Sequence, residues 1–511
     1  MMLIDIFEET AGRTPENLFL HFVADAPAGD VRLTYGETNR RASAFARLLR
    51  DRGVGKGDVV ALLLPNSAEW LCCYFGCQKI GAITAGLNTD LLASDLEFYV
   101  SLVKARVIVT TDEFNDVAAS LARAAPTVEL MVSTAPVDTM VGLPAAGAAL
   151  SRDPDLKDTD YLSIVFTSGT TGSAPKAALQ TSGSIARGIA GYQDRLQIGP
   201  RDRVTLVTPL FHGSALNWGI TMSVIGGGCV VLARKFSASR FWEQADRAGS
   251  TVLWTMGAIV FILLTLEPTE TERRAAARLR IIFGAATAAR WRQIADRWPE
   301  ATVLDGFGMT ETPGTLTEDD CYERPDLFPC VGRPVLGVDL RIADPETGET
   351  LRHGQVGEIV VRYGQGFATY FDNPDAFAEA VRDGWFRTGD LAYQDETGRV
   401  FFVDRLKAII RRGGENISSL EVEEVLVRHP DVAEAVALPK PHPILGDTVL
   451  AALVPKVHGH VFSLEEIRSF CEGRLATFKI PEDVRTIEAG VIPRTETGRV
   501  KKPMLRKALG L

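Results

Sequence analysis

A strand-like run that leads into a cluster of small and hydroxyl residues is the segment of this sequence best suited to chemistry. Residues 161–166 are mostly apolar, and Pro175 and Lys176 follow the cluster. Small residues let backbone N–H groups approach phosphate oxygens, hydroxyls add donors, and lysine supplies charge. No Gly-Lys-Ser/Thr follows, so this is not a Walker loop. We interpret it as a phosphate-binding loop rather than a flexible linker, formed by Thr167, Ser168, Gly169, Thr170, Thr171 and Gly172.

The end of the chain is basic although the protein as a whole carries a net charge of -10. From Arg494 onward there is one acid, Glu496, against six basic residues, which are Arg494, Arg499, Lys501, Lys502, Arg506 and Lys507. Binding to a phosphate backbone needs many neutralising cations, and neither interleaved aromatic residues nor a recognition helix accompanies this run. We therefore expect no nucleic-acid partner.

The elements that must position these residues alternate along the first four hundred residues. Residues 58–66 (DVVALLLPN) have the composition of a buried strand, and 67–82 have helical spacing. The other strand candidates are 106–112, 203–210, 229–233, 251–255, 279–285 and 301–308. Strands separated by helices predict layered α/β architecture, in which ligands collect at the strand ends.

The pattern changes near residue 335. Residues 340–365 are typical of antiparallel β structure with Pro/Gly turns. Further on, Ser418 with Glu421 and Ser463 with Glu466 predict two capped helices, the first ending near His429, with strand-like runs between them. We predict a large N-terminal domain of layered α/β subdomains with a β-rich subdomain (1–404) and a small mobile α+β domain (405–511).

Cysteines and apolar runs indicate the cellular setting. The seven cysteines form no CxxC pair and no zinc pattern, which favours reduced thiols in the cytoplasm. Cys73 and Cys77 would share one buried helix face. The N-terminus has acids where a secretory signal needs positive charge, so we expect no export. The longest apolar run, 251–266, is shorter than the roughly 20 residues that span a bilayer and is interpreted as a buried helix or pocket wall.

Taken together, these motifs resemble the adenylate-forming superfamily of acyl-CoA synthetases, peptide-synthetase adenylation domains and beetle luciferases. The hydroxyl-rich loop ending in Pro-Lys matches the family's phosphate motif, and the other matches follow in the family's order. They are LTYGE (33–37), GAITAGLNTDL (81–91), PLFHG (209–213), FGAAT (283–287), DGFGMTET (305–312), GWFRTGDLA (384–392) and DRLKAIIRRGGENIS (404–418). The resemblance covers nearly the whole chain.

The resemblance implies a site for ATP and AMP. Phe307 stands where most relatives have Tyr, and it keeps the surface on which adenine stacks. Asp390 accepts from the ribose hydroxyls, and Arg405 donates to the same sugar. The implied nucleotide-binding residues are the loop 167–172 with Gly284, Ala285, Ala286, Asp305, Gly306, Phe307, Gly308, Met309, Thr310, Asp390 and Arg405.

The resemblance also implies the catalytic, metal, hinge and thiol-binding residues. The expected catalytic set is His212, Lys176, Thr310, Glu311 and Arg499. Glu311 and Thr170 are the expected Mg²⁺ ligands, because hard cations prefer oxygen. The small domain is expected to rotate about Lys407, which brings Gly413, Gly414 and Glu415 to coenzyme A.

The implied reaction has two halves. A carboxylate attacks the α-phosphorus of ATP and expels pyrophosphate, and a thiol, expected to be coenzyme A, then attacks the acyl carbon and releases AMP. Positioning and electrostatic stabilisation carry the first half. The expected partners are a carboxylic acid, ATP and coenzyme A, without integral membrane association. Whether the chain forms a homodimer is left open.

One departure from the family falls on a catalytic position. Relatives end in Pro-Arg-Thr-x-Thr-Gly-Lys, whereas this chain has PRTETGR (493–499), so Arg499 replaces the lysine. Arg keeps the charge but brings a larger planar fork. Losing such a contact outright costs roughly 3–4 kcal/mol, or about 10² to 10³ in rate. Three interpretations stay open: Arg499 serves as the adenylation cation, adenylation is slowed while transfer to CoA is preserved, or the residue is a deliberate substitution that traps one state. The second is our working hypothesis.

The implied acyl pocket is lined by apolar and small residues, which leave room for an acyl chain. Its expected lining is His212, Ala215, Trp218, Met256, Gly257, Val260 and Thr312. No Asp in this set would bind an amino group, which disfavours amino acids, and the residues after 400 look most like medium-chain, carnitine-type and fatty-acid ligases. Two alternatives stay open. One is an adenylation enzyme that serves a carrier protein, and the other is a nucleotide-binding relative impaired by Arg499.

Overall fold

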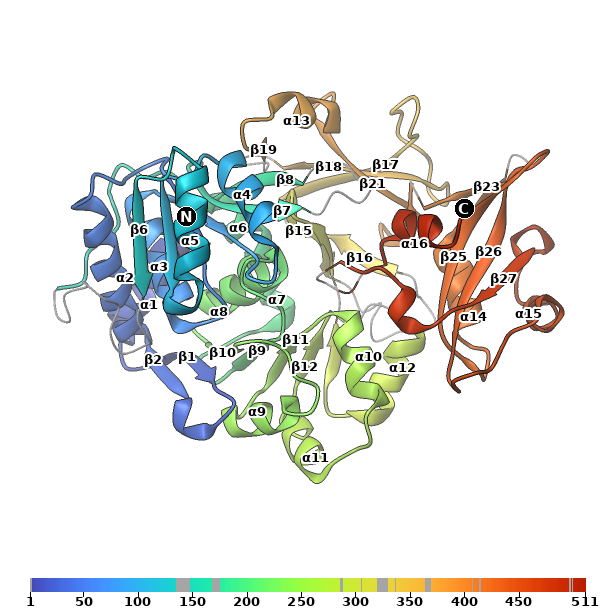
Figure 1. Cartoon of the computed structure of the whole chain (residues 1–511), viewed down its shortest axis with the longest axis horizontal. Helices are drawn as coiled ribbons and strands as arrows, with labels where there is room; N and C mark the ends of the chain where they lie inside the picture. Colours follow the sequence, from blue (N-terminus) through green and yellow to red (C-terminus); the bar gives the residue numbers. More distant parts are fainter. Residues whose placement is uncertain are drawn as a thin grey trace.

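The computed structural model describes most of the chain. The described residues are 2–134, 148–167, 175–284, 288–304, 306–318, 330–335, 337–363, 369–406, 408–412, 415–495, 498 and 500–511. They form four sheets (Figure 1).

Two seven-stranded sheets form the large α/β part, in agreement with the predicted architecture. In the first the order is β13-β12-β11-β9-β10-β1-β2, and in the second it is β19-β8-β7-β4-β3-β5-β6. All neighbours in the first sheet are parallel except β1 and β2. The first sheet comprises β1 (Leu18–Val23), β2 (Val31–Thr34), β9 (Arg203–Leu206), β10 (Cys229–Ala233), β11 (Val252–Trp254), β12 (Ile281–Phe283) and β13 (Thr302–Leu304). The second comprises β3 (Val59–Leu63), β4 (Ile83–Gly86), β5 (Val107–Thr111), β6 (Leu130–Thr134), β7 (Tyr161–Thr167), β8 (Lys176–Thr181) and β19 (Thr369–Tyr370).

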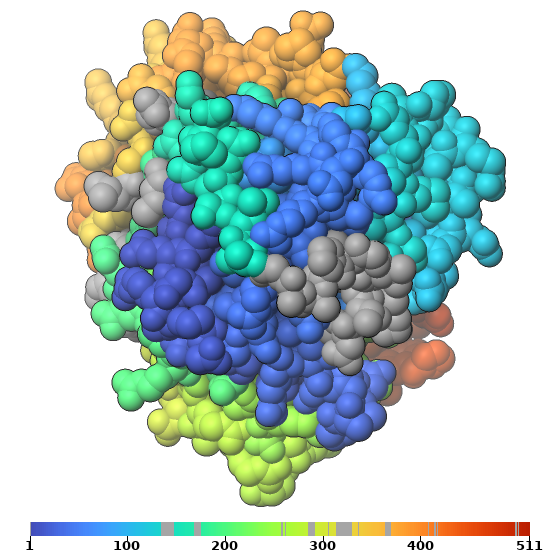
Figure 2. Space-filling view, turned by 90° about the vertical axis from the view of Figure 1, so that its left-hand side faces the viewer, coloured from blue at the N-terminus to red at the C-terminus, as the bar shows by residue number. Residues whose placement is uncertain are grey.

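Helices cover the sheets and fill the space between them. They are α1 (Leu3–Arg13), α2 (Tyr35–Arg50), α3 (Ala68–Ile80), α4 (Ala93–Leu102), α5 (Asn115–Ala124), α6 (Ser182–Ala190), α7 (Gln193–Leu196), α8 (Thr221–Gly226), α9 (Phe241–Ala248), α10 (Gly257–Thr265), α11 (Glu270–Ala276) and α12 (Ala288–Arg297). On the side shown in Figure 2, the first 130 residues, in blue and cyan, form most of the surface. The yellow-green segments lie below them, and the orange segments of the β-rich part lie above.

Helix α3 lies at the centre of the core, where one cluster includes residues from both sheets. Every residue of α3 is buried, and most of them are apolar, as expected for a helix at the centre of a core. Phe75 stacks on Phe7 of α1 with ring centroids 4.0 Å apart. The buried Lys79 is paired with Glu8, and burial lowers the pKa of this lysine.

The N-terminal motif LTYGE (33–37) starts a helix. Thr34 Oγ1 accepts a hydrogen bond from Glu37 N at 3.1 Å, and Thr34 N donates to Glu37 Oε2 at 2.8 Å. This capping box begins α2. The buried Tyr35 hydroxyl donates to the carbonyl of Gly228 at 2.9 Å, which fastens α2 to the start of β10.

The third sheet is antiparallel, as the sequence predicted for residues 340–365. Its order is β14-β15-β16-β22-β21-β18-β17, with β20 on β21. The strands are β14 (Phe307–Met309), β15 (Thr312–Glu318), β16 (Cys330–Pro334), β17 (Val338–Ala343), β18 (Gly357–Tyr363), β20 (Val381–Arg382), β21 (Trp385–Gln394) and β22 (Val400–Arg405), and α13 (Pro374–Ala380) precedes β20.

The C-terminal residues form the fourth sheet, at the right of Figure 1. It contains β24-β23-β26-β25 with β27 on β26. Its elements are β23 (Ile410–Arg412), β24 (Glu415–Ile417), α14 (Ser419–Leu426), β25 (Val432–His442), β26 (Gly446–Pro455), α15 (Leu464–Cys471), β27 (Asp483–Thr486) and α16 (Lys502–Ala508). The first helix ends at Leu426, a turn earlier than predicted. The domain boundary near Asp404–Lys407 stays a prediction.

Two other expectations need correction. The apolar run 251–266 is not one helix: its first part is the predicted strand 251–255, found as β11, and α10 begins only at Gly257. Cys330 is disulfide-bonded, so the expectation of reduced thiols is wrong at that position. Free and buried thiols are found at Cys72, Cys73, Cys77, Cys229 and Cys471. The cytoplasmic location stays a prediction. No helix among the described residues is long and apolar enough to cross a membrane.

Candidate active site

The predicted phosphate loop joins two paired strands. Thr167, at the end of β7, pairs with Lys176, at the start of β8, in antiparallel register. Thr167 Oγ1 also donates to the Lys176 carbonyl at 3.4 Å. The ends of the loop are therefore held together, as in a hairpin.

Lys176 and Glu311 meet on either side of a tyrosine that the sequence analysis did not select. Lys176 Nζ lies 4.5 Å from the centre of the Tyr370 ring, and the Tyr370 hydroxyl donates to Glu311 Oε1 at 2.7 Å. Tyr370 and Glu311 are both buried. Burial, followed by the nearby Glu311 carboxylate, raises the pKa of the Tyr370 hydroxyl, which therefore stays a donor. Tyr370 reaches this place because β19 pairs with β8, a long-range contact that no local motif indicates.

A buried amide holds the segment that carries Thr310 and Glu311. These two residues form the turn between β14 and β15. Gln180 Nε2 donates to the Thr310 carbonyl at 2.7 Å, and Gln180 is fully buried. Gln180 Oε1 accepts from Ser163 Oγ at 3.1 Å and from Asn217 Nδ2 at 2.9 Å. Sequence analysis missed Gln180 and Asn217, because a polar residue in an apolar run carries no sign of its partners.

Three motif segments meet at the carboxyl ends of the parallel strands β11, β12 and β13, where such sheets bind ligands. Thr255 N donates to Phe283 O at 2.9 Å, and Gly284 N donates to Leu304 O at 2.9 Å. Gly284 has φ +94°, and a Cβ there would lie 2.3 Å from Thr255 O. Only glycine fits this close approach. Beyond these strand ends, Gly306 leads into β14, which holds the half-buried Phe307 with Gly308 and Met309.

The predicted ribose pair forms a contact between two strands. Asp390 in β21 and Arg405 in β22 are opposite each other in register, and Arg405 Nε lies 3.0 Å from Asp390 Oδ1. Asp390 is buried, whereas Arg405 is about one-third exposed, with a side-chain exposure of 36%. A buried carboxylate beside a guanidinium can accept hydrogen bonds from hydroxyl groups, such as those of a ribose.

The expected acyl-pocket wall follows His212 in a π-helix. His212 Nδ1 accepts from Ser214 N at 3.1 Å, which places the ring proton of neutral His212 on Nε2. The π-helix runs over Ser214–Ile220, and it contains the buried Ala215 and the half-buried Trp218. Single π turns of this kind are frequent at functional sites.

Aromatic rings back this wall. Trp218 lies 4.8 Å from Tyr192 and 5.7 Å from both Trp254 and Phe283, measured between ring centroids. Trp254 and Phe283 are the last residues of β11 and β12, and they stack 4.1 Å apart. The wall therefore adjoins the strand ends that carry the nucleotide motifs.

The structure does not bring every expected pocket residue to this wall. Val260 of α10 packs with Leu253 and Ile282 in a separate core cluster. Trp254 belongs to the cluster on the other face of the same sheet, because successive strand residues point to opposite faces. Met256 and Gly257 lie just beyond the end of β11, and Thr312 is fully buried at the start of β15.

Asp404 joins the antiparallel sheet to the C-terminal unit. Its Oδ2 accepts from Ser419 Oγ at 2.7 Å and from Leu420 N at 3.2 Å, and its Oδ1 accepts from Arg405 N at 2.7 Å. A carboxylate at the first turn of α14 is favourable because of the helix dipole. Further along, Glu415 begins β24 and is exposed.

Two basic residues of the tail are paired inside the C-terminal unit. Arg494 forms two 2.6 Å contacts with the Glu434 carboxylate, and Lys502 Nζ lies 2.8 Å from Glu423 Oε1. Part of the basic character of the tail is therefore structural. The predicted site residues that lie outside the described residues are Ser168, Gly169, Thr170, Thr171, Gly172, Ala285, Ala286, Asp305, Lys407, Gly413, Gly414 and Arg499.

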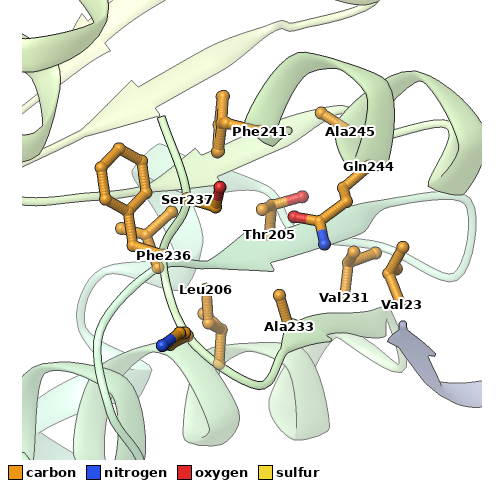
Figure 3. A pocket seen from close by; sticks show the side chains of 12 residues that line it. Val23, Thr205, Leu206, Val231, Ala233, Phe236, Ser237, Phe241, Gln244 and Ala245 are labelled. Carbon is orange, nitrogen blue, oxygen red and sulfur yellow. The ribbon is translucent and has the colours of Figure 1, made fainter. Parts of the chain in front are cut away.

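A small cavity of about 20 Å³ lies elsewhere, between the first sheet and α9 (Figure 3). Apolar side chains such as Val231, Phe236 and Phe241 line most of it. A space of that size holds about one water molecule, so it is no substrate site.

Comparison with known proteins agrees with this arrangement. Residues 7–371 match the model of the AMP-binding enzymes, and residues 421–499 match that of the AMP-binding enzyme C-terminal domain. The chain is 30% identical to the long-chain-fatty-acid–CoA ligase FadD13 of Mycobacterium tuberculosis, over 94% of each chain. It is 30% identical to the oxalate–CoA ligase of Arabidopsis thaliana, over 98% of this chain and 97% of the relative. Among solved structures, ATP-bound MatB from Rhodopseudomonas palustris superposes with a TM-score of 0.86 at 27% identity, with 99% of each chain covered.

The fold and the two matched regions define an AMP-binding enzyme with its C-terminal domain. Within that class, the chain belongs to the family of AMP-forming acid–CoA ligases.

Proposed function

We propose that this enzyme activates an apolar carboxylic acid with ATP, using the residues that meet around Tyr370, and transfers the acyl group to coenzyme A. The observation that carries the proposal is the convergence of Lys176, Tyr370 and Glu311 beside the turn that holds Thr310. These groups come from distant parts of the chain. Together they offer a cation, a hydroxyl and a carboxylate at the antiparallel edge of the second sheet.

In the first half-reaction, an oxygen of the acid attacks the α-phosphorus and pyrophosphate leaves. Lys176 and the hydroxyl-rich loop (167–172) balance the phosphate charge, and the Thr310 hydroxyl donates to the α-phosphate. Asp390 and Arg405 hold the ribose, and Phe307 supports the adenine. Fixed donors of this kind stabilise charge that develops in the transition state.

Glu311 fits the expected magnesium ion. Its carboxylate is buried, and one carboxylate oxygen accepts a hydrogen bond from Tyr370 at 2.7 Å. The carboxylate therefore offers the oxygen ligands that Mg²⁺ prefers. Thr170 is the second proposed ligand. When bound, the ion neutralises phosphate charge.

In the second half-reaction, the thiol of coenzyme A attacks the acyl carbon and AMP leaves. We propose that the C-terminal unit turns about Lys407, so that Gly413, Gly414 and Glu415 meet the thiol-bearing arm. The Asp404 contacts to α14 support a coupling between this turn and the ribose-binding Arg405, which is the next residue.

We propose an acyl group without a positive charge. The aromatic wall formed by Trp218, Trp254 and Phe283 supports this choice, since it provides apolar surface. His212, with its proton on Nε2, supports a donor at the polar end of the pocket.

A panel of carboxylic acids scored for AMP release, with and without coenzyme A, tests the function. We expect acyl-CoA and AMP in equal amounts with the preferred acid. Pyrophosphate exchange without CoA transfer, combined with acylation of a phosphopantetheinyl carrier protein, would indicate the carrier-directed alternative. Nucleotide binding without exchange would indicate the impaired relative.

The Arg499→Lys variant tests the hypothesis of slowed adenylation. We expect pyrophosphate exchange to rise about tenfold or more, which is less than the 10²–10³ that a fully lost contact costs, because Arg keeps the charge. Transfer to CoA from supplied acyl-adenylate should not change. Equal exchange rates in the two proteins would contradict the hypothesis.

A further inference from the structure

A polar cleft of about 360 Å³ lies at the end of the first sheet opposite the candidate active site. It opens at the amino ends of β1 and β9, which begin at Leu18 and Arg203, whereas the nucleotide motifs follow the carboxyl ends of parallel strands. The end of α9 forms another side. The charged and titratable residues that line the cleft are His21, Arg32, Arg203, Asp246, Arg247 and Arg278.

Two of the lining arginines are already paired. Arg247 holds the Asp30 carboxylate with contacts of 3.0 and 3.1 Å and reaches Glu243 at 3.2 Å. Arg278 is paired with Asp246, which also binds Arg274 at 2.6 Å. These pairs account for the acids around the cleft and hold both guanidiniums in place.

The other two arginines that line the cleft are Arg32 and Arg203. Among the residues that the structure describes, no carboxylate lies within ion-pair distance of Arg32 or Arg203. Arg32 Nε faces His21 Nε2 at 3.4 Å, and Arg203 contacts the Cys229 thiol. His21 is buried, and its Nε2 also lies 3.1 Å from Asp30 Oδ2. The pKa of His21 is lowered, chiefly by burial and further by Arg32 and Arg203, while the Asp30 carboxylate acts in the opposite direction. The imidazole is therefore neutral and does not compensate either cation.

This local excess of positive charge is unusual in a protein with a net charge of -10. Unpaired guanidiniums beside one another repel, and a bound anion removes that repulsion. Guanidinium forks match the oxygens of phosphate groups, and they do so in a partly enclosed cleft more effectively than on open surface. The volume suits a compact ligand.

We propose that this cleft is a second anion site, separate from the nucleotide site, which binds a phosphate-bearing ligand through Arg32 and Arg203. Arg247 and Arg278 complete its positive rim. The phosphate belongs either to a small soluble ligand or to a lipid headgroup, and the chemistry of recognition is the same.

The test uses inorganic pyrophosphate, titrated calorimetrically into the full chain. The native protein should show a component that the Arg32→Ala/Arg203→Ala variant loses, with at least a tenfold weaker affinity. Pyrophosphate binding at the active site occurs in the native protein and in the variant, so it does not contribute to the difference between the two titrations. The matched control is Arg13→Ala/Arg273→Ala, because both arginines are exposed and pair only with neighbours on their own helices.

A local readout assigns the site. The His21 imidazole signal, followed by NMR during a pH titration, should show its pKa rising when pyrophosphate neutralises the two arginines. Binding elsewhere would leave that signal unchanged. If the double variant does not fold, Arg32→Ala alone serves, since Arg32 is exposed.

Sedimentation with phosphatidylcholine vesicles, with and without phosphatidic acid, distinguishes a soluble phosphate ligand from a lipid headgroup. Loss of pyrophosphate binding in the double variant supports a soluble ligand. Loss of binding to acidic vesicles alone supports a lipid headgroup. The proposal would be overturned if the native protein bound neither pyrophosphate nor acidic vesicles. It would also be overturned if the double variant bound both as the native protein does.

Discussion

At the residue scale, Gln180 is a residue that sequence patterns did not indicate, although it holds the turn that carries Thr310. It is fully buried, and its amide bonds the Thr310 carbonyl, Ser163 and Asn217. Hydrogen bonds are directional, so the buried amide of Gln180 fixes the distance between β8 and the turn that carries Thr310 more firmly than an apolar side chain would. Through Asn217 in the π-helix, the same amide links the acyl wall to the turn that carries Glu311.

The Gln180→Leu variant tests this role. It leaves the partners of Gln180 buried without hydrogen bonds, at about 1–3 kcal/mol each. We expect pyrophosphate exchange to fall by about tenfold or more, with kcat affected more than KM. The control is Gln193→Leu, which removes a bond to the Ile198 carbonyl and none of the bonds made by Gln180. An equal loss of exchange in both variants would show that Gln180 acts only through stability.

At the scale of elements, α14 carries a buried carboxylate that costs stability at neutral pH. Burial raises the pKa of Glu424 from 4.5 to about 7, and among the described residues its Oε1 has no hydrogen-bond partner. The folded state therefore holds the proton more tightly than the unfolded state. The free energy of unfolding falls as the pH rises from about 4.5 to 7, and the whole loss is present above pH 7.

Removing this charge should stabilise the C-terminal unit at alkaline pH. In urea unfolding we expect Glu424→Gln to gain about 2 kcal/mol at pH 8 and little at pH 4.5. Glu465→Gln, at an exposed position on α15, should change neither value. The same gain at both pH values would contradict the role of ionisation.

At the scale of the whole molecule, the basic tail is fastened to the element that also contacts the N-terminal part. Lys502 bonds Ser419 Oγ at 2.5 Å and Glu423 at 2.8 Å, and Ser419 Oγ donates to Asp404 at 2.7 Å. The tail, α14 and the end of β22 are therefore one connected polar network. Arg499 lies three residues before Lys502, so this network sets where the tail begins its last helix.

We predict that Lys502→Met loosens the tail. Hydrogen exchange over 419–426 and 502–508 should accelerate, because Glu423 loses the cation that compensates a buried carboxylate. Pyrophosphate exchange should fall about tenfold through misplacement of the tail. Lys507→Met, at an exposed position on the same helix, is the control. Unchanged hydrogen exchange in Lys502→Met would contradict the network.

Local patterns in the sequence were sufficient to predict the elements that are determined by residues close together in the chain. The Ser463–Glu466 capping box and the alternating strands of the large part are confirmed. The strand predicted at 251–255 is confirmed by β11, but the helix interpretation of the whole run 251–266 is wrong. A buried strand and a buried helix are both apolar, and periodicity does not separate them. The disulfide at Cys330 had no signature in the spacing of the cysteines.

The sequence by itself determined the family, the layered α/β architecture and the order of the motifs, because these depend on local composition and spacing. Only the tertiary structure decided that Tyr370 stands between Lys176 and Glu311, that Gln180 holds Thr310, and that Val260 lies on the other face of the sheet from Trp218. These results come from pairing strands and packing faces far apart in the chain. Such contacts are set by how whole elements fit together, which no single stretch of sequence encodes.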